Sequence, residues 1–407
     1  MKILLASDAY FPMINGVVIS TKILKEALES RGHDVRVLTV GEKSKYLEDQ
    51  KTYYLASRST EYFYPEARVA FMSDHQLRNA IMAWGPDLVH SQSEFSIFLQ
   101  AKKLSRLLGI PWVHTYHTAY ENYTHYSRIF KGLIDRHLPG LLNYYLKDVD
   151  LIITPSQKTR ASLEGFKINK RIEVLATGID LSPFAKKISP EKRQALRASY
   201  GLGKEDLVLL FLGRLGEEKN LEEALSYFSR LEDPRIKFLI VGMGPLYKSL
   251  CQEAKALGLG ADRLIFAGKI PHTATPSYYQ MADLFLSASV SETQGLTYIE
   301  ALASGLPVLA RKDPCQEGVL ENNLNGYRYE SFEDFKAFIG TYQKDLDFRD
   351  RLSKTAYSRA QAGFSSQEFA AQMEAYYLEV LSQKGSQARK RGLAPLINKV
   401  SPFIKRA

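Results

Sequence analysis

One stretch of the 407-residue chain carries the strongest structural signal: Ser289-Val290-Ser291-Glu292-Thr293-Gln294-Gly295-Leu296-Thr297-Tyr298-Ile299-Glu300, continued by Ala301-Leu302-Ala303-Ser304-Gly305-Leu306-Pro307-Val308-Leu309. The apolar run Leu284–Leu286 in front of it predicts a buried strand. Gly295 then opens a turn, Thr297–Ser304 is rich in helix formers, and Gly305 with Pro307 beyond it ends the helix. The stretch therefore predicts a strand, a loop, a helix and a second strand in succession.

A glycine-containing loop at the start of a helix suits an anion, because unpaired backbone N–H groups and the positive end of the helix dipole point into the same space. Gly295, Leu296 and Thr297 occupy this position. Glu292 precedes the turn, and we expect Glu300 about two turns into the helix, where it can accept hydrogen bonds from a diol. A phosphate between a sugar and a ribose would suit this arrangement. The alternative is an ordinary amphipathic helix with two incidental glutamates.

The whole string resembles the E-x7-E signature of retaining glycosyltransferases of family 4. The tail Ala301-Leu302-Ala303-Ser304-Gly305-Leu306-Pro307-Val308 is similar to that family's "EA-A-G-PV" helix and strand. The resemblance extends from Met1 to about Leu381. It implies the α/β GT-B architecture, two facing Rossmann-like domains with parallel sheets and an interdomain cleft. It also implies transfer of a hexose from a nucleotide sugar with retention of configuration.

Length and strand spacing agree with two domains. A chain of 407 residues is long for one domain, and short apolar strands alternate with helical stretches along it, which predicts parallel sheets covered by helices. We expect a first domain over 1–178 that also includes a returning helix over 364–383, and a second domain over 179–363. The resemblance makes the first domain the acceptor-binding one and the second the nucleotide-sugar-binding one.

Composition and charge exclude several classes of protein. Two cysteines, Cys251 and Cys315, argue against a disulfide framework and suit a reducing cytoplasm. The apolar N-terminus is too short for a signal peptide, and no apolar run approaches the ~20 residues of a membrane-spanning helix. The net charge is +9, yet no nucleic-acid recognition fold accompanies it. The sequence gives no indication of oligomeric state.

Two cations follow the first predicted strand of the second domain. In Gly213-Arg214-Leu215-Gly216-Glu217-Glu218-Lys219-Asn220, Arg214 and Lys219 come at the carboxyl end of a strand and suit a diphosphate. A solvated charged loop is the plain alternative. The string resembles the family's "GR…EK" motif, which implies that Arg214 and Lys219 stabilise the leaving nucleotide diphosphate.

Two places in the first domain point to substrate contacts. Gly16, at a strand-to-helix turn, is a possible point of phosphate approach. The segment His114-Thr115-Tyr116-His117-Thr118-Ala119-Tyr120 resembles the family's "HT-Y" segment. That likeness implies that His117 borders donor sugar and acceptor and that Tyr120 lines the substrate site, while His114 is a core residue.

The sequence predicts no metal and no other cofactor besides the nucleotide-sugar donor. Asp148-Val149-Asp150 fits a metal-binding D-x-D pattern, but it leads directly into a strand, and we interpret it as structural. The task of neutralising the diphosphate then falls to Arg214, Lys219 and helix dipoles.

The acceptor loop and the C-terminal tail point to a lipid. Ser-Glu-Thr-Gln-Gly-Leu-Thr-Tyr over 291–298 and the His114–Tyr123 segment resemble bacterial diacylglycerol glucosyltransferases that make glycolipid anchors, which implies UDP-glucose and diacylglycerol as substrates. Residues 120–147 mix aromatic and basic side chains, as an interfacial surface does. Residues 384–407 form a basic amphipathic tail with seven Lys/Arg and no acid, suited to an anionic membrane. We therefore expect a cytoplasmic protein, peripheral on the inner face of the cell membrane.

Other functions remain open at this point. The acceptor could be a soluble glycan or sugar phosphate, with the tail merely solubilising, and the donor sugar could be galactose. A non-catalytic partner on the same fold is a different class, but it should have lost Glu292, Glu300, Arg214 or Lys219, and all four are present. A nucleotide-sugar epimerase would not need the tyrosine-rich acceptor segment beside His117.

Overall fold

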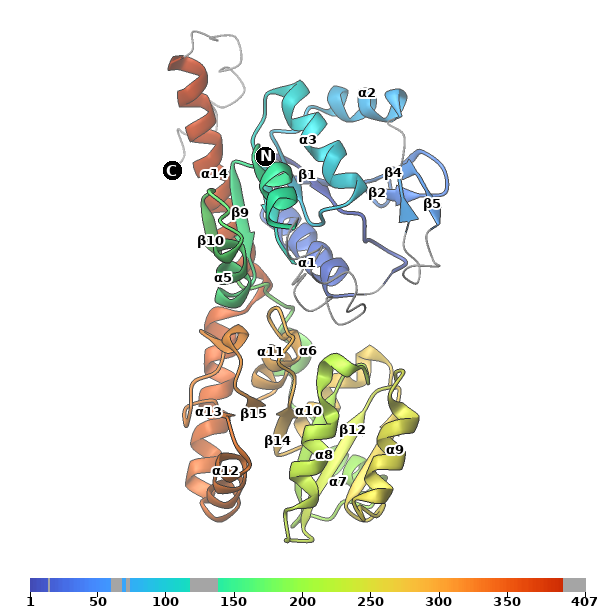
Figure 1. The fold of residues 1–407 in the computed structure, drawn as a ribbon, viewed down its shortest axis with the longest axis vertical. Coiled ribbons are helices and arrows are strands. Elements are labelled where there is room, and N and C mark those ends of the chain that lie inside the picture. Colours follow the sequence, from blue (N-terminus) through green and yellow to red (C-terminus); the bar gives the residue numbers. More distant parts are fainter. Residues whose placement is uncertain (14, 60–67, 71–73, 118–137, 391–407) are drawn as a thin grey trace. The chain divides into compact units, whose positions relative to one another are not determined.

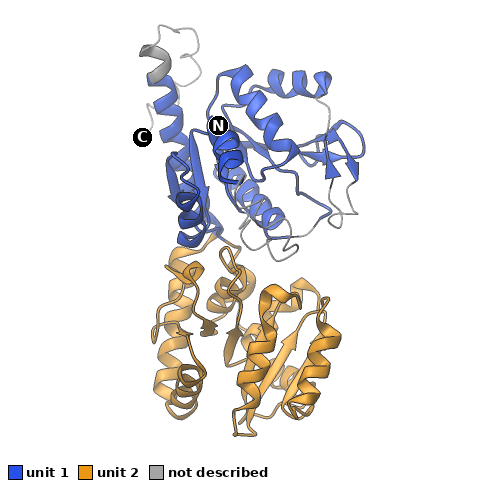
Figure 2. Cartoon of the chain, in the orientation of Figure 1, with its two compact units in different colours: residues 1–178, 366–407 blue, residues 179–365 orange. Residues whose placement is uncertain are grey.

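The computed structural model describes residues 1–13, 15–59, 68–70, 74–117 and 138–390. Tyr120, most of the predicted surface over 120–147, and residues 391–407 of the predicted tail lie outside the described residues. Two compact units divide the chain (Figure 2): unit 1 comprises Met1–Gly178 and the segment that begins at Ser366, and unit 2 comprises Ile179–Ser365.

Eight of the ten described strands of unit 1 form one sheet, parallel except for the edge strand β3. From edge to edge the strands are β10 (Ile172–Val174), β9 (Leu151–Thr154), β8 (Trp112–Thr115), β7 (Leu88–Ser91), β1 (Lys2–Ala6), β2 (Asp34–Gly41), β4 (Thr52–Ala56) and β3 (Lys45–Leu47). The antiparallel strands β5 (Arg58–Ser59) and β6 (Arg68–Val69) form a separate two-stranded sheet. Strands β7, β8 and β9 are buried along their whole length, as expected for strands covered on both faces.

Helices cover both faces of this sheet (Figure 1). One face packs against α2 (His75–Trp84), α3 (Ser96–Leu108), α5 (Gln157–Gly165) and helical residues 138–146. The other face packs against α1 (Gly16–Ser30) and α14 (Ser366–Lys390). Although α14 follows unit 2 in the sequence, its Phe369, Met373 and Tyr377 are core residues of unit 1.

The last helix is longer than predicted. We expected the returning helix to end by residue 383, but α14 continues to Lys390. Lys384, assigned to the tail in the sequence analysis, lies 3.1 Å from the Asp150 carboxylate. This ion pair fixes an additional turn against unit 1, so Lys384 belongs to the folded unit, and the prediction that the tail begins at residue 384 is wrong.

Unit 2 contains a second parallel sheet, of six strands. In spatial order these are β13 (Leu264–Gly268), β12 (Ile236–Val241), β11 (Leu207–Leu212), β14 (Leu284–Ser287), β15 (Val308–Arg311) and β16 (Gly326–Tyr329). Its helices are α6 (Ser182–Ala185), α7 (Pro190–Ala198), α8 (Leu221–Ser229), α9 (Tyr247–Ala256), α10 (Thr275–Met281), α11 (Leu296–Ala303), α12 (Phe332–Lys344) and α13 (Leu346–Gly363). Two parallel sheets with covering helices confirm the predicted α/β fold class.

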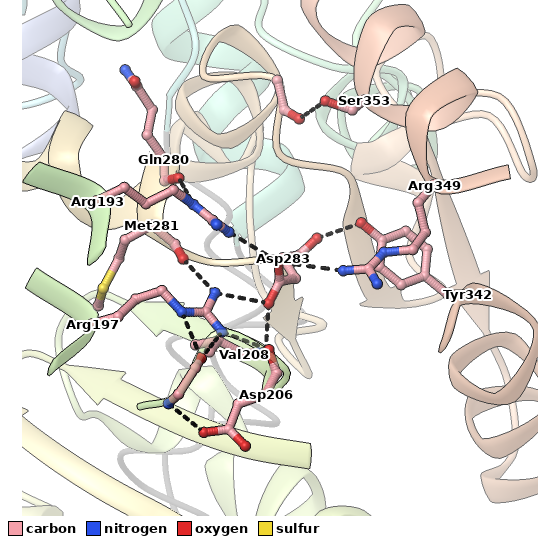
Figure 3. A network of polar contacts seen from close by, with 12 residues as sticks. Arg193, Arg197, Asp206, Val208, Gln280, Met281, Asp283, Tyr342, Arg349 and Ser353 are labelled. Carbon is pink, nitrogen blue, oxygen red and sulfur yellow. Dashed lines mark hydrogen bonds and ion pairs between the residues drawn. The ribbon is translucent and has the colours of Figure 1, made fainter. Parts of the chain in front are cut away.

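A charged cluster holds the amino ends of the central strands of unit 2 (Figure 3). Asp283, one residue before β14, accepts from Arg193 at 3.1 Å, Arg197 at 3.2 Å and Arg349 at 3.4 Å. It also accepts from the backbone N–H of Val208 in β11 at 2.8 Å. A cavity of about 320 Å³ opens beside this cluster. Because parallel α/β sheets bind ligands at the carboxyl ends of their strands, the candidate site lies at the opposite end of the sheet.

Candidate active site

The loop between β14 and α11 forms a helix start that only glycine allows. Gly295 caps α11 with φ 75°, a left-handed conformation, and a Cβ on it would lie 2.5 Å from the ring of Tyr298. Gly295 has no side chain to cap the helix, and no side-chain cap bond is present there. The N–H groups of Leu296 and Thr297 therefore head α11 beside the positive end of its dipole, as an anion site requires.

Glu300 lies nearer the helix start than predicted. It is the fifth residue of α11, little more than one turn from Gly295, so the expected two turns were wrong. Tyr279 of α10 donates to Glu300 Oε2 at 2.7 Å. Burial raises the pKa of Glu300 to about 7, and the Tyr279 hydrogen bond opposes that rise. Tyr279 was not predictable from the sequence, because it lies in no motif and meets Glu300 only through the packing of α10 on α11.

Glu292 and Lys219 lie in direct contact. The ammonium of Lys219, at the end of a short 3₁₀ turn over Glu217–Lys219, pairs with the carboxylate of Glu292 in the β14–α11 loop. Both side chains are mostly buried, at 21% and 18% exposure. The structure thus brings together two predicted site residues that are 73 positions apart in the sequence.

Arg214 lies on the same loop as Lys219 but is exposed, and it pairs with Glu218 at 2.8 Å. Two serines of the β14–α11 loop fasten the loops to each other: Ser289 Oγ and Ser291 Oγ each donate to the carbonyl of Glu218 at 2.8 Å. Hydrogen bonds between the two loops therefore fix the loop that carries Arg214 and Lys219 against the loop that leads into α11.

Two glycines, Gly242 and Gly244, lie in a third loop, which follows β12. Neither glycine was predicted from the sequence as part of the site. A Cβ on Gly242 would lie 1.8 Å from the carbonyl oxygen of Gly213, and one on Gly244 would lie 2.3 Å from that of Leu215. The backbone N–H of Leu215 donates to Met243 O at 3.1 Å. These glycines let the β12 loop lie directly against the loop that carries Arg214. A G-x-G-P string directly after the apolar run Phe238–Val241 was the available signal.

In unit 1, His117 follows β8, and its ring is within hydrogen-bond distance of the Gln92 side chain. Its Nε2 lies 2.9 Å from Gln92 Oε1. Burial, and next the neighbouring His114, lower the pKa of His117 to about 3, so the ring is neutral at pH 7. His114 itself is fully buried, 3.2 Å from Glu94 Oε1 and 2.9 Å from Ser91 Oγ.

Gly16 is the first residue of α1, and the preceding Asn15 side chain accepts from Val18 N–H at 3.0 Å. Among the residues that the structure describes, none lies within 4 Å of a Cβ built on Gly16, and the backbone of Gly16 does not have a positive φ. The approach of a ligand at this helix start stays a prediction. Tyr120, the remaining predicted substrate residue, lies outside the described residues.

The two carboxylates of the D-x-D pattern have structural partners. Asp148 pairs with Lys102 and with Arg106, each at 2.8 Å. Asp150 accepts from the backbone N–H of Trp112 at 2.9 Å and from Lys384. These contacts support the structural interpretation of both residues, and metal independence stays a prediction.

The unit 2 residues meet where the strand order reverses. Lys219 follows β11, and Glu292 follows β14; these strands are neighbours, and the sheet grows outward in opposite directions from them. Such a switch point is where parallel α/β sheets bind ligands. Backbone N–H groups and a lysine suit phosphates, while two carboxylates suit the hydroxyl groups of sugars.

Comparison with known proteins identifies the family to which the chain belongs. The model described as Glycosyltransferase Family 4 matches residues 14–183, and that described as Glycosyl transferases group 1 matches residues 192–359. The alpha-monoglucosyldiacylglycerol synthase of Streptococcus pneumoniae is 34% identical over 95% of this chain and 88% of its own. That of Acholeplasma laidlawii is 29% identical over 96% of this chain and 100% of its own.

The solved structures agree on the fold. The crystal structure of HepE from Anabaena in complex with UDP superposes with a TM-score of 0.72, covering 92% of this chain and 99% of that one at 18% identity. Together with the two parallel sheets and the E-x7-E loop, these matches place the chain among enzymes that transfer sugars. It belongs to the family 4 glycosyltransferases of GT-B architecture.

Proposed function

We propose that this glycosyltransferase moves glucose from UDP-glucose onto 1,2-diacylglycerol, with retention of the anomeric configuration, at the cytoplasmic surface of a membrane. The observation that carries the proposal is the similarity, over nearly the whole chain, to the alpha-monoglucosyldiacylglycerol synthase of Streptococcus pneumoniae. Solved structures of HepE hold UDP, glucose or UDP-glucose, which supports the choice of donor.

In this proposal, the site residues of unit 2 bind the donor, UDP-glucose. The N–H groups at the start of α11 and the ammonium of Lys219 meet the diphosphate, and Arg214 adds a second cation. Glu300 accepts from the ribose hydroxyls, and Glu292 accepts from hydroxyls of the glucose. These charges replace a metal ion in neutralising the leaving group, and they are in place before reaction because the loops are hydrogen-bonded to each other.

The transfer step needs positioning more than a strong base. The bond between glucose C1 and the phosphate oxygen breaks, and UDP leaves with its electron pair. The lipid hydroxyl oxygen bonds to C1 on the same face, and its proton passes to the departing phosphate oxygen. With a pKa of about 3, His117 is too weak a base to take that proton, so its role is to orient a hydroxyl group.

An exposed apolar and basic surface on unit 1 supports a membrane acceptor. The outer side of α3 presents Leu99 and Leu107, 48% and 53% exposed. The adjacent helix over 138–146 presents Leu141 and Tyr144, 52% and 62% exposed. Lys102 lies over the Tyr144 ring at 5.2 Å and Lys147 at 4.3 Å. Apolar groups beside cations suit the interface of an anionic bilayer. None of the helices that the structure describes has the length and apolar character needed to cross a bilayer.

The direct test uses vesicles of diacylglycerol and anionic phospholipid with radiolabelled UDP-glucose, and with UDP-galactose in parallel. We expect organic-extractable glucolipid with an α linkage by NMR. Lys219→Ala and Glu292→Ala should each lower the rate at least 100-fold, since each removes a charge at the reacting groups. Lys237→Ala is the matched control, because Lys237 is a half-buried lysine near the amino end of β12 that donates to the carbonyl of Asp262, and the variant should keep wild-type activity.

Other products would redirect the proposal. UDP release with only water-soluble sugars would assign a soluble acceptor. A faster reaction with UDP-galactose would change the donor, and a β linkage would contradict retention.

Membrane attachment is tested separately by vesicle flotation. The pair Leu141→Ser and Tyr144→Ser should release the protein from anionic vesicles while preserving its affinity for UDP. Leu346→Ser is the matched control, because Leu346 is a leucine of unit 2 that is even more exposed than Leu141. Unchanged flotation of the double variant would assign attachment to another part of the chain.

A further inference from the structure

A line of buried polar side chains leads to His117 from the core of unit 1. Tyr377 Oη of α14 lies 2.6 Å from Nδ1 of His90 in β7. His90 Nε2 lies 3.1 Å from Gln92 Nε2, and Gln92 Oε1 lies 2.9 Å from His117 Nε2. Gln92 is 1% exposed, and His90 and Tyr377 are fully buried. The proposed transfer reaction uses none of these three residues directly.

The amide of Gln92 gives this line a direction, because one end of an amide donates and the other accepts. Its NH₂ faces His90 Nε2, so that nitrogen accepts. The hydroxyl of Thr115, 2.7 Å away, is a second donor to it. His90 must then carry its proton on Nδ1 and donate to Tyr377. At the other end, the Gln92 carbonyl oxygen can only accept, so His117 must carry its proton on Nε2.

Neither imidazole is charged at neutral pH. Burial, followed by the nearby histidines, lowers the pKa of His90 well below its ordinary value, and the pKa of His117 falls to about 3. Burial likewise keeps Tyr377 protonated by raising its pKa well above the ordinary value. With one proton on each ring, its location is set by hydrogen bonding alone.

We propose that Gln92 is a positioning residue for His117: its amide, oriented by His90 and Tyr377, holds the ring as the Nε2–H tautomer with Nδ1 as the acceptor for a substrate hydroxyl. This rests on the proposed function, in which His117 orients a hydroxyl group. Without Gln92, the ring would lose both its fixed orientation and its single tautomer. The C-terminal helix α14 thereby contributes, through Tyr377, to the chemistry of a residue that follows β8.

The tautomers are measured directly by ¹⁵N NMR of full-length protein labelled at histidine, with His117→Asn and His90→Asn assigning the two rings. In the wild type we expect His117 as Nε2–H and His90 as Nδ1–H across pH 6–8. In Gln92→Leu, His117 should lose its single-tautomer signature. In Gln92→Glu the carboxylate accepts from both sides, so His117 should keep Nε2–H while His90 reverses to Nε2–H. A merely structural glutamine would not produce that opposite response.

Kinetics provide the second readout. Gln92→Leu should lower kcat about tenfold, equivalent to one hydrogen bond, while the Kd for UDP stays within twofold. Gln92→Glu should recover part of the rate, since it restores an acceptor for His117. Ser93→Ala is the matched control: Ser93 is a buried neighbour that donates to Asp8 and not to this line, so both histidine tautomers should stay unchanged.

The outcomes separate this proposal from the function itself. A wild-type His117 with its proton on Nδ1, or an unchanged His117 spectrum in Gln92→Leu, would overturn the positioning role. Full transfer activity in His117→Ala would also overturn it while leaving the glycosyltransferase assignment intact. Absence of lipid glucosylation by the wild type would refute the proposed function, and the tautomer spectra would still decide the role of Gln92.

Discussion

Burial raises the pKa of Glu300 from 4.5 to about 7, which makes stability depend on pH. Between these values the folded state holds a proton that the unfolded chain has released, so stability falls as pH rises from 4.5 to 7 and then levels. The loss amounts to about 3 kcal/mol at most. Glu300→Gln keeps an acceptor for Tyr279 and removes the titration. Chemical denaturation should therefore show the variant gaining stability over the wild type as pH rises, with the two curves converging below pH 4.5.

The same residue should make donor binding depend on pH. The carboxylate form of Glu300 accepts two hydroxyl groups, whereas the protonated form accepts them poorly. The Kd for UDP-glucose, whose diphosphate stays ionised throughout, should therefore decrease by up to about tenfold per pH unit below pH 7 and level off above it. Calorimetry from pH 5.5 to 8.5 measures this. A wild-type profile as flat as that of Glu300→Gln would exclude Glu300 from the ribose contact.

The start of α11 can be tested as a structural element. Gly295→Ala places a Cβ against Tyr298 in a left-handed conformation, and should cost about 1–3 kcal/mol and weaken UDP binding. Gly340→Ala is the matched control, since Gly340 lies inside α12, where a Cβ would have none of the described residues within 4 Å. That change should stabilise unit 2 by up to about 1 kcal/mol and leave UDP binding unchanged. Thermal unfolding and calorimetry with UDP provide both numbers.

For the whole molecule, α14 predicts an asymmetry between the two units. Unit 2 is one continuous segment, whereas unit 1 needs Phe369, Met373 and Tyr377 from the chain beyond it. Burial of each such side chain contributes about 1.5–3 kcal/mol to the free energy of unfolding. The three contributions together are comparable to the net stability of a typical domain. Residues 179–365 should therefore fold alone with a cooperative thermal transition, while residues 1–178 should not. Adding residues 366–390 as a separate peptide should restore the transition of 1–178, and a cooperative transition without the peptide would contradict this account.

The sequence was informative wherever a signal was local. The strand predicted at Leu284–Leu286 is β14 (Leu284–Ser287), because apolar runs and breakers are properties of neighbouring positions. The Gly295 turn was predictable for the same reason. The pairing of Lys219 with Glu292, the Tyr279 bond to Glu300 and the line through Gln92 were not, since each joins elements whose approach depends on packing. The length of α14 was misjudged because Lys384, just beyond the predicted end of the helix, has its partner in Asp150, which lies far away in the sequence.

The ion pair between Lys219 and Glu292 affects the release of the nucleoside diphosphate product. On the proposed function, a bound nucleotide sugar draws Lys219 toward phosphate and compensates Glu292 with sugar hydroxyls, so both members of the pair exchange one partner for another. Once the sugar has been transferred, Glu292 has lost its compensation and competes with the diphosphate for the lysine. Loss of the sugar thus lowers the affinity of Lys219 for the remaining nucleoside diphosphate. The two side chains that bind the substrate therefore also promote release of the product.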